Sequence, residues 1–404
     1  MLGMSRAGFD ALGKGLDAAS GGLNKEVRSA ENVSTDRLFL LDFLKALSIV
    51  AVVSFHATFV PRAYYSSSAM AVDVLFAPLR FCVPVLLVIS FFLLARSVER
   101  SSRSWKHLVR RKLARLLLPT VFWFSLGALK MFAQGKSIGQ VMGAIAIGEA
   151  FTGAYYLVIL YQLMPVGIWL MRKVLVVERL SLARSERVWP EKMRRDRWQK
   201  GLLACACGVH AGVMLSFYMV ASSASWIERV SALGRVPGVY WMGYVLLGLW
   251  VYRGLPVLVD YSKRLAFLTK AALLTVLAVA FWTEYHALSS WRGGLVVPFE
   301  YMLVSCFLSA PIIVLCAGNV QAANFPGWAQ KWFVLLSRYS LGIFCINGIL
   351  SEIFLAIGSR LAAGMSFGYW QVLMLRVVGW GILLLVSLAI ARRLEKLGLK
   401  QVVC

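Results

Sequence analysis

Charged residues are scarce in this sequence, at 15% of its 404 positions, whereas soluble globular proteins carry about 25%. Hydrophobic residues fill 59% of the positions, and the mean hydropathy is +0.71. This balance excludes an ordinary soluble protein and predicts a polytopic membrane protein. Acidic residues are also few, 19 against 43 Lys and Arg. Basic loops beside a membrane explain this excess more simply than nucleic acid does, so no nucleic-acid partner is expected.

The sequence has little that could form disulfides or hold a metal ion. Its seven cysteines are an odd number, and six of them lie in or beside apolar runs, so a disulfide framework is not expected. Cys205 and Cys207 are two residues apart, which on a helix points them about 200° apart. No His or acid lies at a coordinating spacing from this pair, and we therefore predict no metal site.

Apolar segments of about 17 to 22 residues predict ten transmembrane helices. The predicted fold is thus all-α, an integral membrane bundle. Tryptophans near the predicted helix ends, among them Trp123, Trp241 and Trp370, are expected in the interfacial aromatic belts. The ten segments are 39–59, 75–95, 116–133, 154–171, 201–222, 238–252, 265–283, 296–317, 338–356 and 371–391.

The basic residues set the expected orientation. With both termini in the cytoplasm, most of the 43 Lys and Arg fall in cytoplasmic segments, as the positive-inside bias requires. This predicts a mobile cytoplasmic tail over 1–36, a membrane domain over 37–391 and a basic cytoplasmic tail over 392–404. Residues 134–153 are too short an apolar run, and too interrupted by glycine, to cross. We expect them to form a re-entrant or interfacial segment on the outer side.

The first predicted helix carries three ionisable residues, Asp42, Lys45 and His56. The eleven-residue step from Lys45 to His56 turns a helix to within roughly 20° of three full turns, so both side chains share one face. Asp42, three residues before Lys45, lies on that face too. Charged groups inside a membrane are costly and usually mark function. The alternative is a structural ion pair between Asp42 and Lys45 with a histidine that only packs.

The order Arg37, Asp42, Lys45, His56 at the start of the first helix resembles the signature of the acyltransferase 3 family. These are multi-span O-acyltransferases that modify cell-surface polysaccharides and related acceptors. The resemblance implies that His56, Lys45 and Asp42 are the catalytic residues, with His56 as general base. Asp42 is expected to pair with Lys45 or a neighbouring helix, and Arg37 to have a supporting role. A neutral imidazole is the commonest base for taking a proton from a hydroxyl.

Four further motifs resemble the family. Val83 to Ser90 is similar to its second-helix motif, although Phe91 stands where the family has glycine. Tyr155-Tyr156-Leu157 resembles an aromatic element before the fourth helix, and Gly243 to Gly248 a small-residue helix motif. Ser340 to Asn347 resembles the ninth-helix motif, in which the family commonly ends in His; Asn347 cannot accept a proton. The resemblance implies supporting roles for Ser90, Tyr156 and Asn347.

A basic pair before the third helix, Lys112 and Arg115, also matches the family, and Arg111 lies beside it. On composition alone this cluster is a topology determinant or a contact for anionic lipid. The resemblance implies a donor site, because acyl-coenzyme A carries about four negative charges on its phosphates. No cofactor is expected to stay bound; acyl-coenzyme A, with acetyl favoured, is the donor substrate.

The resemblance therefore predicts an O-acyltransferase of the cell membrane, the inner membrane in a bacterium. Its acceptor is a hydroxyl of an exopolysaccharide, a cell-wall glycan or a lipid-linked sugar, and its partners include membrane lipids and a polysaccharide synthase or export complex. Two alternatives stay open from the residues. One is a transporter or flippase with Asp42, Lys45 and His56 as a coupling relay, and the other is a non-catalytic subunit of a polysaccharide synthase.

Overall fold

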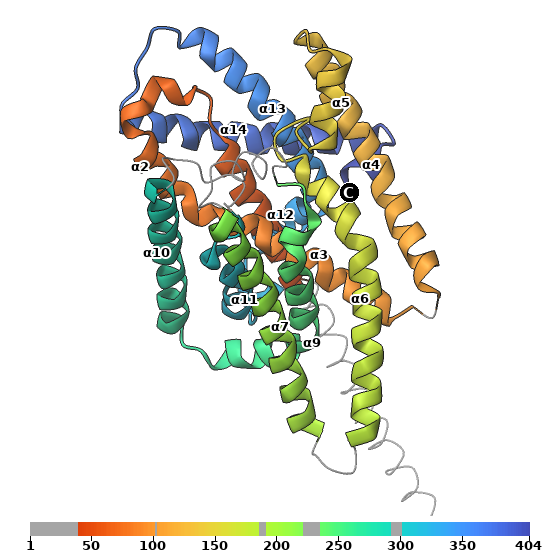
Figure 1. The fold of residues 1–404 in the computed structure, drawn as a ribbon. Coiled ribbons are helices and arrows are strands. Elements are labelled where there is room, and N and C mark those ends of the chain that lie inside the picture. Colours follow the sequence, from red (N-terminus) through yellow and green to blue (C-terminus); the bar gives the residue numbers. More distant parts are fainter. Residues whose placement is uncertain (1–38, 102, 186–190, 221–234, 292–300) are drawn as a thin grey trace, which may run out of the picture.

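The structure is a computed structural model that describes residues 39–101, 103–185, 191–220, 235–291 and 301–404. Within these ranges every regular element is a helix (Figure 1). The elements are the N-terminal helix (Phe39–His56), η1 (Arg62–Tyr65), α2 (Ser66–Phe76), η2 (Ala77–Phe81), α3 (Cys82–Glu99), α4 (Trp105–Ala133), α5 (Ile138–Ala146), α6 (Tyr155–Ser185), α7 (Glu191–Val220), η3 (Gly238–Trp241), α9 (Met242–Arg264), α10 (Phe267–Trp291), α11 (Val304–Ala317), η5 (Ala322–Asn324), α12 (Gly327–Arg338), α13 (Ser340–Leu361), α14 (Tyr369–Lys396) and α15 (Lys400–Val403).

The predicted all-α membrane bundle is confirmed. In the described part of the chain, eight helices are long and apolar enough to cross a membrane. The two other predicted segments correspond to α7 and to α11, which has 14 residues. The protein is thus a multi-pass membrane protein, while the side on which its termini lie stays a prediction.

Two helix boundaries depart from the sequence prediction. The predicted helix 75–95 is divided, because Pro78 lies in the 3-10 turn η2 that separates α2 from α3. The segment 172–200, between the predicted membrane helices 154–171 and 201–222, is largely helical, since α6 runs to Ser185 and α7 begins at Glu191. With 31 residues, α6 is about 46 Å long and exceeds the roughly 30 Å of a bilayer's hydrocarbon core. Both helices project from one end of the bundle (Figure 1).

Two short helices, α5 and α15, complete the domain. The segment 134–153 contains α5, whose nine residues extend only about 14 Å and cannot cross a bilayer. Ser137 and Gln140 cap its start through reciprocal hydrogen bonds. At the other end of the chain, α15 packs against α4, because the carbonyl of Val402 accepts a 2.9 Å bond from Trp123 Nε1. Val402 and Val403 are buried there.

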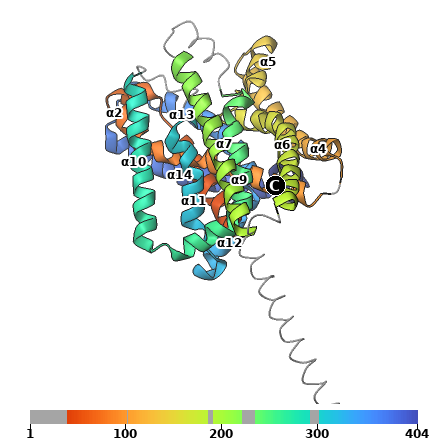
Figure 2. The same ribbon diagram turned by 60° about the horizontal axis from the view of Figure 1, so that its bottom comes forward.

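The core lies around α3, which packs against α6, α9 and α11. Two tryptophans predicted for the interfacial belts belong to this buried part, so that prediction is wrong for them. Trp123 and Trp241 are 2% and 1% exposed, and each indole donates to a backbone carbonyl, Trp241 to Arg235. Trp370 is 73% exposed, as a belt residue would be. By contrast, α10 stands at the edge of the bundle in two views (Figures 1 and 2) and is the least buried of the eight long apolar helices.

The N-terminal helix and α13 run side by side in the same direction. Asp42 contacts Ser337, which lies just before α13, and His56 contacts Asn347 within it. Beyond Asn347, two glycines of α13 allow other segments of the backbone to approach the helix closely. A Cβ on Gly348 would overlap the carbonyl of Thr152, and one on Gly358 would overlap the carbonyl of Phe59. Small residues serve this purpose generally where membrane helices approach closely.

We expect Gly358→Ala to destabilise the protein by about 1 to 3 kcal/mol, because the added methyl group forces Phe59 and α13 apart. Gly381→Ala on α14 is the matched control, since no atom from another described segment lies within 4 Å of its Cβ position. Alanine there should be neutral or stabilising by up to about 1 kcal/mol. Thermal unfolding of the two purified variants measures both effects, and equal melting temperatures would contradict the prediction.

Candidate active site

His56 ends the N-terminal helix and forms a hydrogen bond with α13. Its Nδ1 lies 2.8 Å from Nδ2 of Asn347. The imidazole is half-buried, whereas Asn347 is fully buried. Oδ1 of Asn347 has no hydrogen-bond partner among the described residues. An imidazole held on one nitrogen by a buried amide has a fixed ring orientation and a defined tautomer.

A small cavity lies beside the imidazole. Its volume is about 10 Å³, close to the space that one water molecule needs. Gly153, with φ at +89°, brings the chain against Phe344, and a Cβ there would meet the ring at 2.9 Å. The cavity is too small for an acyl group, which therefore fits next to His56 only when side chains that line the cavity move. The lining residues are Val52, Phe55, His56, Cys82, Val83, Gly153, Tyr155, Tyr301 and Phe344.

A second hydrogen-bonded pair, Tyr156 and Ser90, lies next to Phe344. Tyr156 packs on that ring with 5.4 Å between centroids, and its hydroxyl is 3.3 Å from Ser90 Oγ. Ser90 in turn donates to the carbonyl of Leu86 at 2.8 Å. Phe91 is accommodated by Gly248 of α9, whose Cβ would lie 2.5 Å from that of Phe91. The missing glycine at position 91 is thus compensated by a glycine across the interface.

A buried arginine also flanks the site, and the sequence analysis did not select it. The guanidinium carbon of Arg80 lies 4.7 Å from the ring centroid of Phe55, the neighbour of His56, and 4.1 Å from that of Tyr285. Cation–π contacts of this kind strengthen when desolvated. In the sequence, Arg80 could have been recognised as a single cation inside the apolar run between Pro78 and Val85. Such a charge is unusual in a membrane segment.

An ion pair links α4 to α13 near the site. Lys130 of α4 bonds the carboxylate of Glu352, which also accepts a 2.9 Å bond from Thr152. Lys130 additionally donates to the carbonyl of Ala150 at 3.3 Å. These contacts tie the loop before α6 to α13, five residues beyond Asn347. Both charged residues interrupt apolar runs. Because a charge in the bilayer is costly in free energy, they too could have been identified from the sequence as candidate functional residues.

The model of an acyltransferase domain, acyltransferase 3, matches residues 39–392. The chain belongs to the acyltransferase 3 family. A comparison with curated proteins and with solved structures finds no match. As a membrane acyltransferase of this family, the protein takes an acyl donor and an acceptor. Among its described residues, no group of three His, Cys, Asp or Glu could hold a metal ion.

The other family-motif residues on the N-terminal helix lie away from His56. Asp42 accepts a 2.5 Å hydrogen bond from Ser337 Oγ, so it contacts a neighbouring helix, one of its two predicted alternatives. Lys45 is half-buried one turn later. Lys45 and His56 are about 16 Å apart along the helix, and the structure therefore does not bring the three ionisable residues into one contact group. Arg37 lies outside the described residues.

The family's basic pair, Lys112 and Arg115, lies toward the N-terminal end of α4, away from Lys130. Arg111 and Arg115 are exposed and Lys112 is half-buried. Lys112 precedes Lys130 by 18 residues, about 27 Å along the helix. Since Lys130 contacts Glu352 near Asn347, the basic cluster and His56 lie toward opposite ends of this part of the bundle. An acyltransferase that bound donor phosphates at Lys112 would need the flexible arm of the donor to span that separation.

Proposed function

We propose that the protein transfers an acyl group, most simply acetyl, from acyl-coenzyme A to a hydroxyl of a glycan or lipid-linked sugar. The observation that carries this proposal is the His56–Asn347 hydrogen bond beside a cavity within the acyltransferase domain. His56 is the general base. It takes the proton of the hydroxyl as that oxygen attacks the thioester carbonyl, and it returns the proton to the departing thiolate of coenzyme A.

This role defines how Asn347 must be oriented during transfer. With Nδ2 donating to Nδ1, a neutral imidazole keeps its proton on Nε2 and cannot act as a base there. Rotation of the amide by 180° places Oδ1 at Nδ1 instead. The proton is then held on Nδ1, and Nε2 becomes the basic nitrogen. Among the described residues Oδ1 has no hydrogen bond that this rotation would break.

An assay for coenzyme A release tests the proposal. Membranes that contain the protein and its native acceptor should release free coenzyme A from acetyl-coenzyme A, and mass spectrometry of surface glycans should detect the added acetyl groups. Cells without the protein should lack them. A transporter or a non-catalytic subunit would release no coenzyme A, and that result would overturn the proposal.

We expect Lys112→Ala and Arg115→Ala to raise the apparent KM for acyl-coenzyme A with a smaller effect on kcat. The reason is that paired cations at the end of a membrane helix hold phosphate groups electrostatically. Arg392→Ala is the control, because Arg392 is an exposed cation at the end of a different helix, α14. Steady-state kinetics at moderate salt measure the effect. Unchanged KM values in both variants would leave the pair with a role in topology alone.

A further inference from the structure

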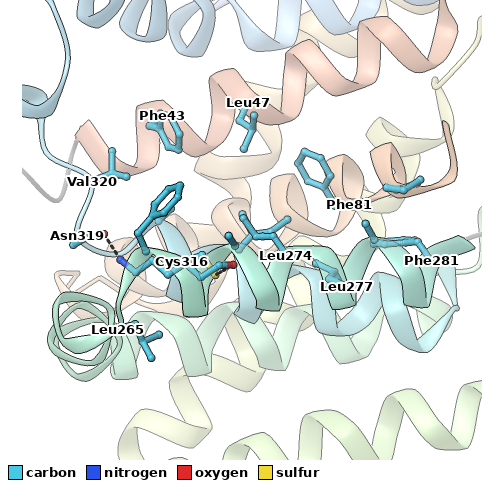
Figure 3. A pocket seen from close by; sticks show the side chains of 17 residues that line it. Phe43, Leu47, Phe81, Leu265, Leu274, Leu277, Phe281, Cys316, Asn319 and Val320 are labelled. Carbon is cyan, nitrogen blue, oxygen red and sulfur yellow. Dashed lines mark hydrogen bonds between the residues drawn. The ribbon is translucent and has the colours of Figure 1, made fainter. Parts of the chain in front are cut away.

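A second, much larger cavity lies apart from His56, between the N-terminal helix, η2, α10 and α11. Its volume is about 720 Å³. Figure 3 shows Phe43 and Leu47 on one wall, Leu274 and Leu277 on another, and Cys316 between Asn319 and Leu274. Leu47 and Leu274 are partly exposed, whereas Phe281 is buried. The cavity is therefore a groove that opens sideways between helices and is closed at the Phe281 end.

The groove is apolar along its length and cationic at one end. Of its seventeen lining residues, two carry charged or amide side chains, Lys270 and Asn319. The ammonium of Lys270 donates to Asn319 Oδ1 at 2.6 Å and to Ser262 Oγ at 3.1 Å. Among the described residues it forms no ion pair, and the nearby Asp260 is paired with Arg264. A positive charge with neutral partners thus lies at the mouth of an apolar groove.

The dimensions match one leaflet of a bilayer. Lys270 and Phe281 are eleven residues apart on α10, about 16 Å along the helix axis. This is about half of the roughly 30 Å hydrocarbon core. Asn319 marks one end of the groove and Phe281 the other in Figure 3. A ligand with its polar group at Lys270 would therefore extend an apolar chain toward the middle of the membrane.

From this geometry we infer that the groove binds an anionic phospholipid, with its phosphate on Lys270 and one acyl chain along α10. The third N–H of Lys270 can donate to a phosphate oxygen while Asn319 and Ser262 accept from the other two. Because the charge of Lys270 has only neutral partners among the described residues, it favours a lipid of net negative charge over a zwitterionic one. The apolar lining selects the chain. This site is separate from the acyl-transfer chemistry proposed above, and its test does not depend on activity.

The groove nevertheless adjoins the active site. Phe81 lines the groove and follows Arg80, whose guanidinium contacts Phe55 of the N-terminal helix and Tyr285 of α10. Phe281 lines it one turn before Tyr285. A lipid in the groove would fill the space between α10 and the N-terminal helix, and so would support the two rings that hold Arg80.

Lipid retention measures the site directly. The full-length protein is reconstituted in nanodiscs with equal amounts of phosphatidylglycerol and phosphatidylcholine, released into mild detergent, and analysed by native mass spectrometry. We expect about a fivefold preference for phosphatidylglycerol, which corresponds to one cation near an anionic headgroup. Lys270→Gln keeps a donor to Asn319 and should abolish the preference while lipid is still retained.

Two further variants complete the test. Ala278→Phe fills the groove and should lower retention of both lipids. Arg264→Gln removes an exposed cation that does not line the groove and should behave as the wild type. The inference is overturned if Lys270→Gln keeps the preference, or if Arg264→Gln loses it equally. Displacement of the lipid by coenzyme A would also overturn it, because the groove would then belong to the donor.

Discussion

His56→Ala is expected to lower acyl transfer by about 10² to 10⁴-fold, the usual cost of removing a general base. The imidazole lies at the end of its helix and is only half-buried, so its loss leaves a small space rather than a large core cavity. The amount of protein in the membrane should therefore stay near that of the wild type. Coenzyme A release and membrane abundance must be measured on the same preparations.

Two other histidines provide matched controls. His210 stacks on Phe307 with 4.2 Å between ring centroids and is buried, so His210→Ala should reduce the amount of folded protein through lost packing. His286 is exposed on α10, and His286→Ala should change neither activity nor abundance. If His56→Ala retained nearly full activity at normal abundance, the base would have to be another group.

Asn347→Leu is expected to lower transfer by about 10²-fold or more, because the imidazole loses the partner that fixes its tautomer. In serine proteases, an orienting residue that favours the wrong tautomer costs about 10⁴-fold in kcat. Asn347→Asp should retain activity, since a carboxylate accepts from Nδ1–H and leaves Nε2 basic. The contrast between the two variants, measured as kcat at equal abundance, identifies Asn347 as a positioning residue.

A purely structural role for Asn347 would give a different result. Leucine is close to asparagine in size and tolerates burial, whereas aspartate at this fully buried position is costly unless it pairs with a cation. Packing alone would therefore favour Asn347→Leu over Asn347→Asp. Higher activity in the leucine variant would exclude the proposed hydrogen-bond function.

The helices could be predicted because the membrane requires long apolar segments with internally bonded backbones. Which side of each helix is buried could not, since lipid is as apolar as a protein core. Trp123 and Trp241 illustrate this limit: they lie near helix ends, yet they are enclosed by protein. The division at Pro78 had a visible signal, because the residue before a proline is disfavoured in a helix.

Only part of the candidate site could be predicted from the sequence. His56 could be selected because an imidazole in an apolar helix is unusual and because its spacing matched a family motif. Its contact with Asn347 could not be derived, because 291 residues separate the two and no local pattern encodes such a distance. Arg80, Lys130 and Glu352 were overlooked, although each is an isolated charge in an apolar run.

The N-terminal helix and its partners Ser337 and Asn347 lie far apart in the sequence, and this affects how the protein is made. The N-terminal helix is synthesised first, and Asp42 and His56 meet Ser337 and Asn347 only after about 290 more residues. At roughly 5 to 20 residues per second, translation of that interval takes about 15 to 60 seconds. During this time a helix with an acid, a lysine and a histidine must remain in or near the bilayer without its partners. Insertion machinery or snorkelling side chains must shelter these groups until α13 arrives, and under the proposed mechanism the newly made chain is inactive until then.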